Sequence, residues 1–323
     1  MKIDKKLELV HFQLTRNCNL RCEFCGQWGK KGFFSNISGS EMSLADWKNT
    51  TDMLCRRREK TGENPSVMLW GGEPLAYPYF DEIADYLKKH GFTLGIVTNG
   101  TLINRHKSAL ESGFKSIYLS VDGDEALHDK IRGKGVFKTV LNNIDTLKTD
   151  AKLTVMTVVT KELVQSFSAY ASAVEKFNPD EIFLQDMIAL TNREVENYRV
   201  RFKKVFSKDA VYVDSWVTDF PFRTNKNLAD SKNYPFKITT KKHGIPNKYG
   251  HCLSPFKHIC IAWNGEVMHC TDFYDFSAGN VKIDDISNIF DNKLSEKFRS
   301  EIVNGKCVLC NHCSWLNNDS FDV

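Results

Sequence analysis

The most informative segment of this chain is TRNCNLRCEFCG, residues 15–26. Its three cysteines, Cys18, Cys22 and Cys25, have the spacing C-x3-C-x2-C and lie on a polar loop after a short apolar run, residues 7–14. A cubane iron–sulfur cluster takes four thiolates, so three thiolates leave one iron open to a non-protein ligand. The spacing therefore predicts a cluster that performs chemistry. The alternative is zinc held by three cysteines and a ligand from elsewhere.

From residue 8 to about residue 188, short apolar runs alternate with helical patterns. This rhythm predicts an α/β fold of repeated βα units, a partial (β/α)6 barrel with its chemistry at the carboxyl ends of the strands. The predicted strands are Glu8–Leu14, Ser66–Trp70, Thr93–Thr98, Ser116–Val121, Leu153–Val159 and Glu181–Gln185. The predicted helices are Ser43–Arg57, Tyr79–His90, Ile103–Glu111, Phe137–Lys148 and Glu162–Phe177.

Several of these strands end in polar or glycine-rich motifs. The second is followed by Gly71-Gly72-Glu73-Pro74, where paired glycines allow close approach of backbone to a ligand and the carboxylate suits an ammonium group. A tight turn is the alternative. The fourth ends at Ser120, before the turn Asp122-Gly123. We expect the next residues to form a loop, in which Arg132 either binds a carboxylate of a cofactor or makes one salt bridge on a solvated surface.

These motifs together resemble the radical S-adenosylmethionine (radical SAM) superfamily, including the aromatic Phe24 before the third cysteine. The resemblance implies that Cys18, Cys22 and Cys25 hold a [4Fe–4S] cluster whose fourth iron is chelated by the methionine part of SAM. It also implies that the loop containing Glu73 receives the SAM amino group, and that Ser120 bonds the SAM ribose or carboxylate. Reductive cleavage of SAM would then yield a 5′-deoxyadenosyl radical that takes a hydrogen atom from the substrate.

A second group of cysteines follows residue 250. Cys252 and Cys270 flank Asn264-Gly265, a strong hairpin signal, and Cys260 alternates with apolar residues inside that hairpin. A helix is predicted near residues 286–299. The chain then supplies a C-x2-C-x2-C run made of Cys307, Cys310 and Cys313.

This second group resembles the SPASM/twitch extension of radical SAM enzymes. The resemblance implies one auxiliary [4Fe–4S] cluster held by Cys252, Cys270 and two of Cys307, Cys310 and Cys313. Which two is left open, and a four-thiolate zinc site is the alternative. Cys260 is either a packing residue, a ligand or a hydrogen-atom donor. Asp272 is a candidate general base, because relatives with this extension can place an acid there.

Composition is that of an ordinary soluble globular protein, with 41% hydrophobic and 26% charged residues and a formal net charge of +4. We expect a barrel over residues 1–190, a connector over 191–250 with a helical pattern from Arg193 to Phe206, and an auxiliary-cluster domain over 251–323. No basic block indicates nucleic acid, and no segment is apolar enough to predict a signal peptide or a membrane span. Ten cysteines without such a signal predict a cytoplasmic metalloprotein.

The predicted activity is hydrogen-atom abstraction that modifies a peptide or protein by oxidation, crosslinking or epimerisation. Two alternatives stay open. One is dehydrogenation or rearrangement of a small polar molecule such as an aminocyclitol or a sugar. The other is a metal-binding interaction protein without turnover. An enzyme of this class also needs an electron donor such as flavodoxin or ferredoxin.

Overall fold

The computed structural model describes residues 3–28, 32–36, 39–217, 234–240 and 251–313. One sheet of ten strands organises these residues, in the order β10-β9-β8-β1-β2-β3-β4-β5-β6-β7. The first six strands are neighbours in chain order and all parallel, as the predicted partial barrel requires. They are β1 (Leu9–Gln13), β2 (Ser66–Trp70), β3 (Leu94–Thr98), β4 (Phe114–Ser120), β5 (Lys152–Val158) and β6 (Glu181–Gln185).

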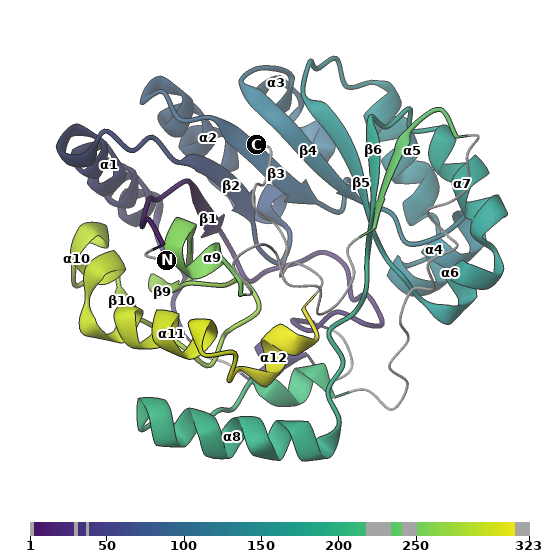
Figure 1. Ribbon diagram of the computed structural model, residues 1–323. Helices are drawn as coiled ribbons and strands as arrows, with labels where there is room; N and C mark the ends of the chain where they lie inside the picture. Colours follow the sequence, from purple (N-terminus) through teal and green to yellow (C-terminus); the bar gives the residue numbers. More distant parts are fainter. Residues whose placement is uncertain (1–2, 29–31, 37–38, 218–233, 241–250, 314–323) are drawn as a thin grey trace.

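Helices cover the outer face of these strands (Figure 1). They are α1 (Leu44–Thr61), α2 (Phe80–Lys89), α3 (Lys107–Glu111), α4 (Glu125–Arg132), α5 (Val136–Asp145), α6 (Lys161–Gln165) and α7 (Phe167–Glu175). Ser43 caps α1, and its capping box with Asp46 satisfies backbone N–H groups that the first turn leaves unpaired. Short 3-10 turns lie at Phe33–Asn36, Pro74–Ala76, Ile103–Arg105 and Val213–Trp216.

The predicted loop after β4 is wrong, because residues 125–132 form helix α4. Asp124 caps its first turn by accepting a hydrogen bond from the backbone N–H of Leu127, and Gly133 ends it. The predicted helix over residues 162–177 is likewise divided at Ser166 into α6 and α7. Both errors concern helices of nine residues or fewer, whose apolar pattern is too short to count over several turns.

The described part of the connector contains a helix and a strand besides the 3-10 turn at Val213–Trp216. The predicted charged helix is α8 (Asn192–Phe206), which packs against α12 (Val308–Asn311). A strand that the sequence analysis did not predict, β7 (Lys237–Thr240), pairs in parallel with β6 and extends the sheet. The prolines at positions 221 and 246 lie outside the described residues.

The C-terminal residues continue the same sheet. After α9 (Ser254–Lys257), strand β8 (His258–Ile261) pairs in parallel with β1, and β9 (Glu266–Met268) returns antiparallel to β8. This is the predicted hairpin, with Gly265 at φ +91°. Strand β10 (Gly279–Asn280) follows, and the predicted helix near residues 286–299 is divided into α10 (Ile286–Asp291) and α11 (Lys293–Val303).

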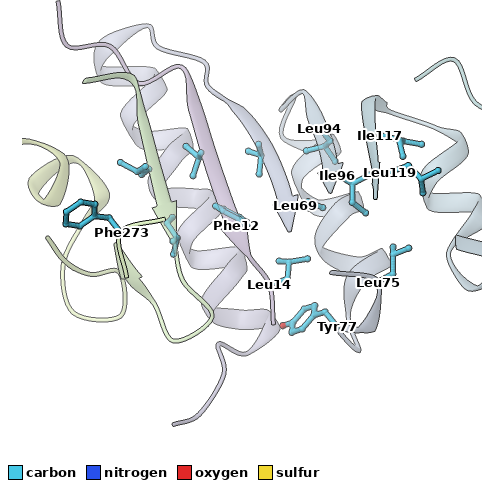
Figure 2. Packing of buried hydrophobic residues seen from close by; sticks show 14 of the residues in the cluster. Phe12, Leu14, Leu69, Leu75, Tyr77, Leu94, Ile96, Ile117, Leu119 and Phe273 are labelled. Atoms are coloured by element: carbon cyan, nitrogen blue, oxygen red, sulfur yellow. The ribbon is translucent and has the colours of Figure 1, made fainter. Parts of the chain in front are cut away.

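The apolar core lies between the sheet and the outer helices. Figure 2 shows Phe12, Leu69 and Ile96 side by side on neighbouring strands in this core. Because successive strand residues point to opposite faces, the alternate residues face the inside of the curved sheet. His11, Met68 and Val97 accordingly line a cavity there. Among the described helices, none is long and apolar enough to cross a membrane.

Candidate active site at the carboxyl ends of the strands

The loop with the first three cysteines rests directly on the Gly71-Gly72-Glu73 turn. The backbone N–H of Gly72 donates to the Thr15 carbonyl at 2.8 Å, and that of Glu73 donates to the Asn17 carbonyl at 2.9 Å. A Cβ on Gly72 would stand 2.3 Å from the Asn17 carbonyl oxygen, and one on Gly71 would stand 2.4 Å from that of Thr15. The glycines are therefore required by the backbone of the cysteine loop itself, a contact that the sequence analysis did not foresee.

Two of the three thiols on this loop already accept backbone hydrogen bonds. The N–H of Leu20 donates to Cys18 Sγ at 3.4 Å, and the N–H of Trp28 donates to Cys25 Sγ at 3.4 Å. Such donors stabilise a sulfur that carries negative charge. Burial raises the pKa of the free Cys18 thiol to about 11. A bound cluster would replace that thiol proton with iron, so the donor set suits a thiolate-ligated metal.

Glu73 is fully buried and holds the ends of two strands together. Its Oε1 accepts from the N–H of Leu75 at 3.1 Å and from Thr98 Oγ1 at 2.7 Å, and its Oε2 accepts from the N–H of Asn99 at 2.7 Å. Each carboxylate oxygen has two acceptor positions, so Oε2 keeps one for a further donor such as an ammonium group. Burial raises the Glu73 pKa to about 7 despite these bonds.

Arg132 ends α4 and forms an ion pair with Asp122 near the cysteine loop. Its Nε donates to the fully buried Asp122 Oδ2 at 2.6 Å, while Asp122 Oδ1 accepts from the N–H of Val158. Burial alone would lower the Arg132 pKa, but Asp122 and the thiols of Cys22 and Cys25 raise it. The cation therefore stands beside the cysteine loop, with Ser120 half-buried at the end of the neighbouring strand.

A cavity opens between the inner face of the sheet and the C-terminal residues. Its sheet side is lined by His11, Met68, Trp70, Val97, Met156 and Gln185. His258 and Cys260 of β8, the strand next to β1 in the same sheet, continue this lining. Cys252, Cys270, Asp272 and Cys313 add to it. Burial raises the Asp272 pKa to about 6 and lowers those of His11 and His258 to about 3 and 4. The two imidazoles are therefore neutral at physiological pH.

The far cysteines that the sequence analysis grouped together do lie close to one another. Burial, Asp272, Cys313 and Cys252 all raise the pKa of the Cys270 thiol. The Cys310 thiol interacts in the same way with Cys307, Cys252 and Cys313. Five thiols thus surround one region, one more than a cubane uses. Cys260 is 1% exposed and lines the cavity, which agrees with packing and also places its thiol at the cavity wall.

A single metal ion and a cubane cluster place different demands on their ligands. Within the described ranges, no three histidine, cysteine, aspartate or glutamate side chains converge tightly enough to hold one metal ion. The cysteines of a cubane each bind a different iron, so they surround the cluster and do not converge on a point. The thiols at residues 18–25 and 252–313, with the donors that face them, fit such a group.

Comparison with known proteins defines the class. A family model described as "Radical SAM superfamily" matches residues 12–169, and one described as "Iron-sulfur cluster-binding domain" (SPASM) matches residues 252–314. The chain belongs to the radical SAM superfamily. Within it, the chain is a member with a C-terminal SPASM domain, so its cofactors are SAM, a SAM-binding [4Fe–4S] cluster and an auxiliary cluster.

Curated relatives cover nearly the whole chain. Fe-coproporphyrin III synthase of Methanosarcina barkeri is 27% identical over 99% of this chain and 84% of that protein. The cysteine-type anaerobic sulfatase-maturating enzyme of Clostridium novyi is 26% identical over 96% of this chain and 86% of that protein. Among solved structures, Streptococcus suis SuiB bound to precursor peptide SuiA is 16% identical, with a TM-score of 0.60 over 96% of this chain and 71% of that one.

Two polar residues near the site were missed by the sequence analysis. Gln13 ends β1 with its side chain fully buried, and Tyr274 follows the cysteine hairpin. A signal for Gln13 was present, since His11 and Gln13 are polar residues at alternating positions of an otherwise apolar strand. Such alternation indicates a strand face directed at a polar site. No comparable signal marks Tyr274.

Proposed function

We propose that this protein is a radical SAM enzyme that abstracts a hydrogen atom from a peptide or protein substrate. Cys18, Cys22 and Cys25 would hold the SAM-binding cluster, and Glu73 would receive the SAM ammonium on its free acceptor position. When bound and reduced, the cluster and SAM supply the 5′-deoxyadenosyl radical. Cys252 and Cys270, with two of the three last cysteines, would hold the auxiliary cluster. An external one-electron donor would complete the system.

The cavity at the inner face of the sheet supports the peptide proposal. Its walls include apolar side chains, neutral imidazoles, thiols, the uncharged polar groups of Gln185, Ser254 and Thr271, and the carboxyl group of Asp272. Such a lining suits an uncharged segment of substrate, as a peptide main chain with a neutral side chain provides. Asp272 would take the proton that an oxidised substrate carbon or heteroatom releases. By its name, the clostridial relative acts on a sulfatase, which is itself a protein.

A small-molecule substrate is the second candidate. The relative from Methanosarcina barkeri is named for a small-molecule product, Fe-coproporphyrin III, and matches almost the full chain. Deuterium transfer separates the two candidates. Cells grown on deuterated medium would be separated into a peptide fraction and a small-molecule fraction, and each would be incubated anaerobically with the reconstituted enzyme, SAM and a reductant.

Mass spectrometry of 5′-deoxyadenosine then identifies the source of the abstracted atom. The peptide proposal expects deuterium in 5′-deoxyadenosine from the peptide fraction and only background from the other. Enrichment from the small-molecule fraction alone would reject it in favour of the second candidate. Absence of 5′-deoxyadenosine with every fraction would favour a metal-binding protein without turnover.

A further inference from the structure

The carboxylate of Glu41 binds the three residues that lead into the cysteine loop. Its Oε1 accepts from the backbone N–H of Arg16 at 2.9 Å and from Thr15 Oγ1 at 2.8 Å. Thr15 is fully buried, and its hydroxyl oxygen in turn accepts from the backbone N–H of Asn17 at 2.9 Å. The donors are two backbone N–H groups and a hydroxyl, so the direction of each bond follows from the atoms themselves. One carboxylate thus fixes two successive backbone N–H groups directly before Cys18.

The carbonyl groups of the same segment bind the turn that contains Glu73. The Thr15 carbonyl accepts from the N–H of Gly72, and the Asn17 carbonyl accepts from the N–H of Glu73. Residues 15–17 are therefore held by Glu41 through their N–H groups and by this turn through their carbonyl groups. Because Cys18 follows the segment directly, a shift of the segment would move the Cys18 thiol relative to the Glu73 carboxylate.

Glu41 itself extends from anchored backbone. The N–H of the next residue, Met42, donates to the Trp263 carbonyl at 2.7 Å, and the Met42 carbonyl accepts from the Tyr77 hydroxyl at 3.3 Å. The Met42 side chain is 2% exposed, and Ser43 then caps helix α1. A side chain supported in this way can act as a fixed acceptor, which is what holding a reactive site in place requires.

The segment matters for chemistry because of the two groups that it connects. Under the proposed function, Cys18 is a ligand of the SAM-binding cluster and Glu73 receives the SAM ammonium. Cleavage of SAM requires an electron to pass from that cluster to the sulfonium, so the rate depends on how the two are aligned. A displacement of about 1 Å, even one caused far from the reacting atoms, can lower a rate about a hundredfold.

We propose that Glu41 is a positioning residue for SAM cleavage. It holds residues 15–17 where the cluster on Cys18 is aligned with SAM bound at Glu73. It acts through the backbone of these residues, and the length of its side chain is the property that matters. This inference rests on the proposed roles of Cys18 and Glu73 and deepens them, and it requires no particular substrate.

Hydrogen exchange tests the contact itself, in the reconstituted protein without SAM. Glu41→Asp keeps the charge and shortens the side chain by one carbon–carbon bond, about 1.5 Å. Glu41→Gln keeps the length, and its amide oxygen can accept from the same two donors. Mass spectrometry with residue-level fragmentation should show about three- to tenfold faster exchange at the Arg16 N–H in Glu41→Asp, the worth of one net hydrogen bond. The Glu41→Gln variant should show a smaller change.

SAM cleavage in the same preparations tests the alignment. The rate constant for 5′-deoxyadenosine formation would be measured with dithionite and saturating SAM, without substrate, and divided by the measured cluster content. We expect Glu41→Asp to lower this rate constant at least about tenfold, while the Kd for SAM changes by less than about threefold because Glu73 is retained. The change that SAM causes in the electron paramagnetic resonance spectrum of the reduced cluster should also differ from that of the wild type. Loss of stability alone would not alter this spectrum.

Two further variants complete the experiment. Thr15→Val removes the hydroxyl that connects Glu41 to Asn17, so exchange should rise at the Asn17 N–H and not at that of Arg16. If Glu41→Asp does not retain its cluster, the rate constant of Thr15→Val decides, and it should also fall at least about tenfold. Glu82→Asp is the matched control, because it makes the same shortening at an exposed position on α2 and should behave as the wild type.

Three results would overturn this role of Glu41. They are unchanged exchange at Arg16 in Glu41→Asp, a wild-type rate constant per cluster in that variant, and a loss in Glu41→Gln as large as in Glu41→Asp, which would assign the effect to charge. Failure of the proposed function gives a different result. A wild type that forms no 5′-deoxyadenosine would reject SAM cleavage as a whole, whereas normal cleavage by both wild type and Glu41→Asp rejects the role of Glu41 alone.

Discussion

Replacing Glu73 with glutamine separates the two roles of this carboxylate, which holds the strand ends and offers a site for an ammonium group. A glutamine oxygen can retain the bonds from Leu75 and Thr98, which both go to Oε1. The third bond is lost, because an NH2 group would face the N–H of Asn99. Leaving one buried N–H unpaired costs about 1–3 kcal/mol. At roughly 2 °C per kcal/mol for a chain of this size, Tm should fall by about 2–6 °C.

The loss in SAM affinity should be larger. A charge-assisted hydrogen bond is worth about 1.5–3 kcal/mol, so removing the charge should raise the Kd for SAM about 10- to 150-fold. Anaerobic calorimetric titration of SAM into the reconstituted protein measures this Kd. Iron content and differential scanning calorimetry report whether the cluster and fold persist. Glu82→Gln, at an exposed position on α2, controls for the change in net charge.

One result would refute this reasoning directly. If Glu73→Gln retains its full iron content and binds SAM with the wild-type Kd, the carboxylate only holds the strand ends together. Alanine at position 73 is a poorer choice. It would leave three donors without a partner and so confuse loss of fold with loss of affinity.

Three other outcomes are expected. Because burial raises the Glu73 pKa to about 7, the affinity of the wild type for SAM should fall as pH decreases from about 7.5 to 6 and the carboxylate becomes neutral. The affinity of Glu73→Gln for SAM should not change over that range. A wild-type affinity that is independent of pH would contradict this prediction. Gly72→Ala would place a Cβ 2.3 Å from the Asn17 carbonyl oxygen and so displace the cysteine loop. Iron analysis should therefore show loss of about one cubane with the auxiliary iron retained. Full iron content would mean that the loop adapts to the added Cβ. Cys270→Ala should remove the auxiliary iron and destabilise residues 251–313 while the first cluster survives. Cys260→Ala is the control and should keep all the iron. Zinc in the purified protein would instead support the zinc alternative.

The sequence predicted the barrel strands well because they are short apolar runs separated by helical patterns. All six predicted strands exist and pair in chain order, since parallel neighbours joined by helices have few other arrangements. Helix α4 escaped prediction because half of its eight residues are charged and only His128 and Ile131 are buried. Strand β7 escaped because Lys237–Thr240 carries a single strongly apolar residue and gains its place from pairing with β6.

In the candidate site, too, some features could be predicted from the sequence and others could not. The cysteine spacings and the Gly71–Pro74 turn are local patterns, so they were visible in the sequence. The contacts that give them shape are not local. Glu73 joins the ends of β2 and β3, and the Gln13–Tyr274 bond spans 261 positions along the chain. Only the fold brings such partners together, which is why Tyr274 carried no signal of its own.

The central claim is that Cys18, Cys22 and Cys25 hold the cluster at which SAM is cleaved. The most direct measurement compares the reconstituted wild type with the variant in which all three are alanine, incubated anaerobically with SAM and dithionite. We expect 5′-deoxyadenosine from the wild type and none from the variant, whose iron and sulfide should fall by about one cubane while the auxiliary cluster stays. Formation of 5′-deoxyadenosine by the triple variant would contradict the claim.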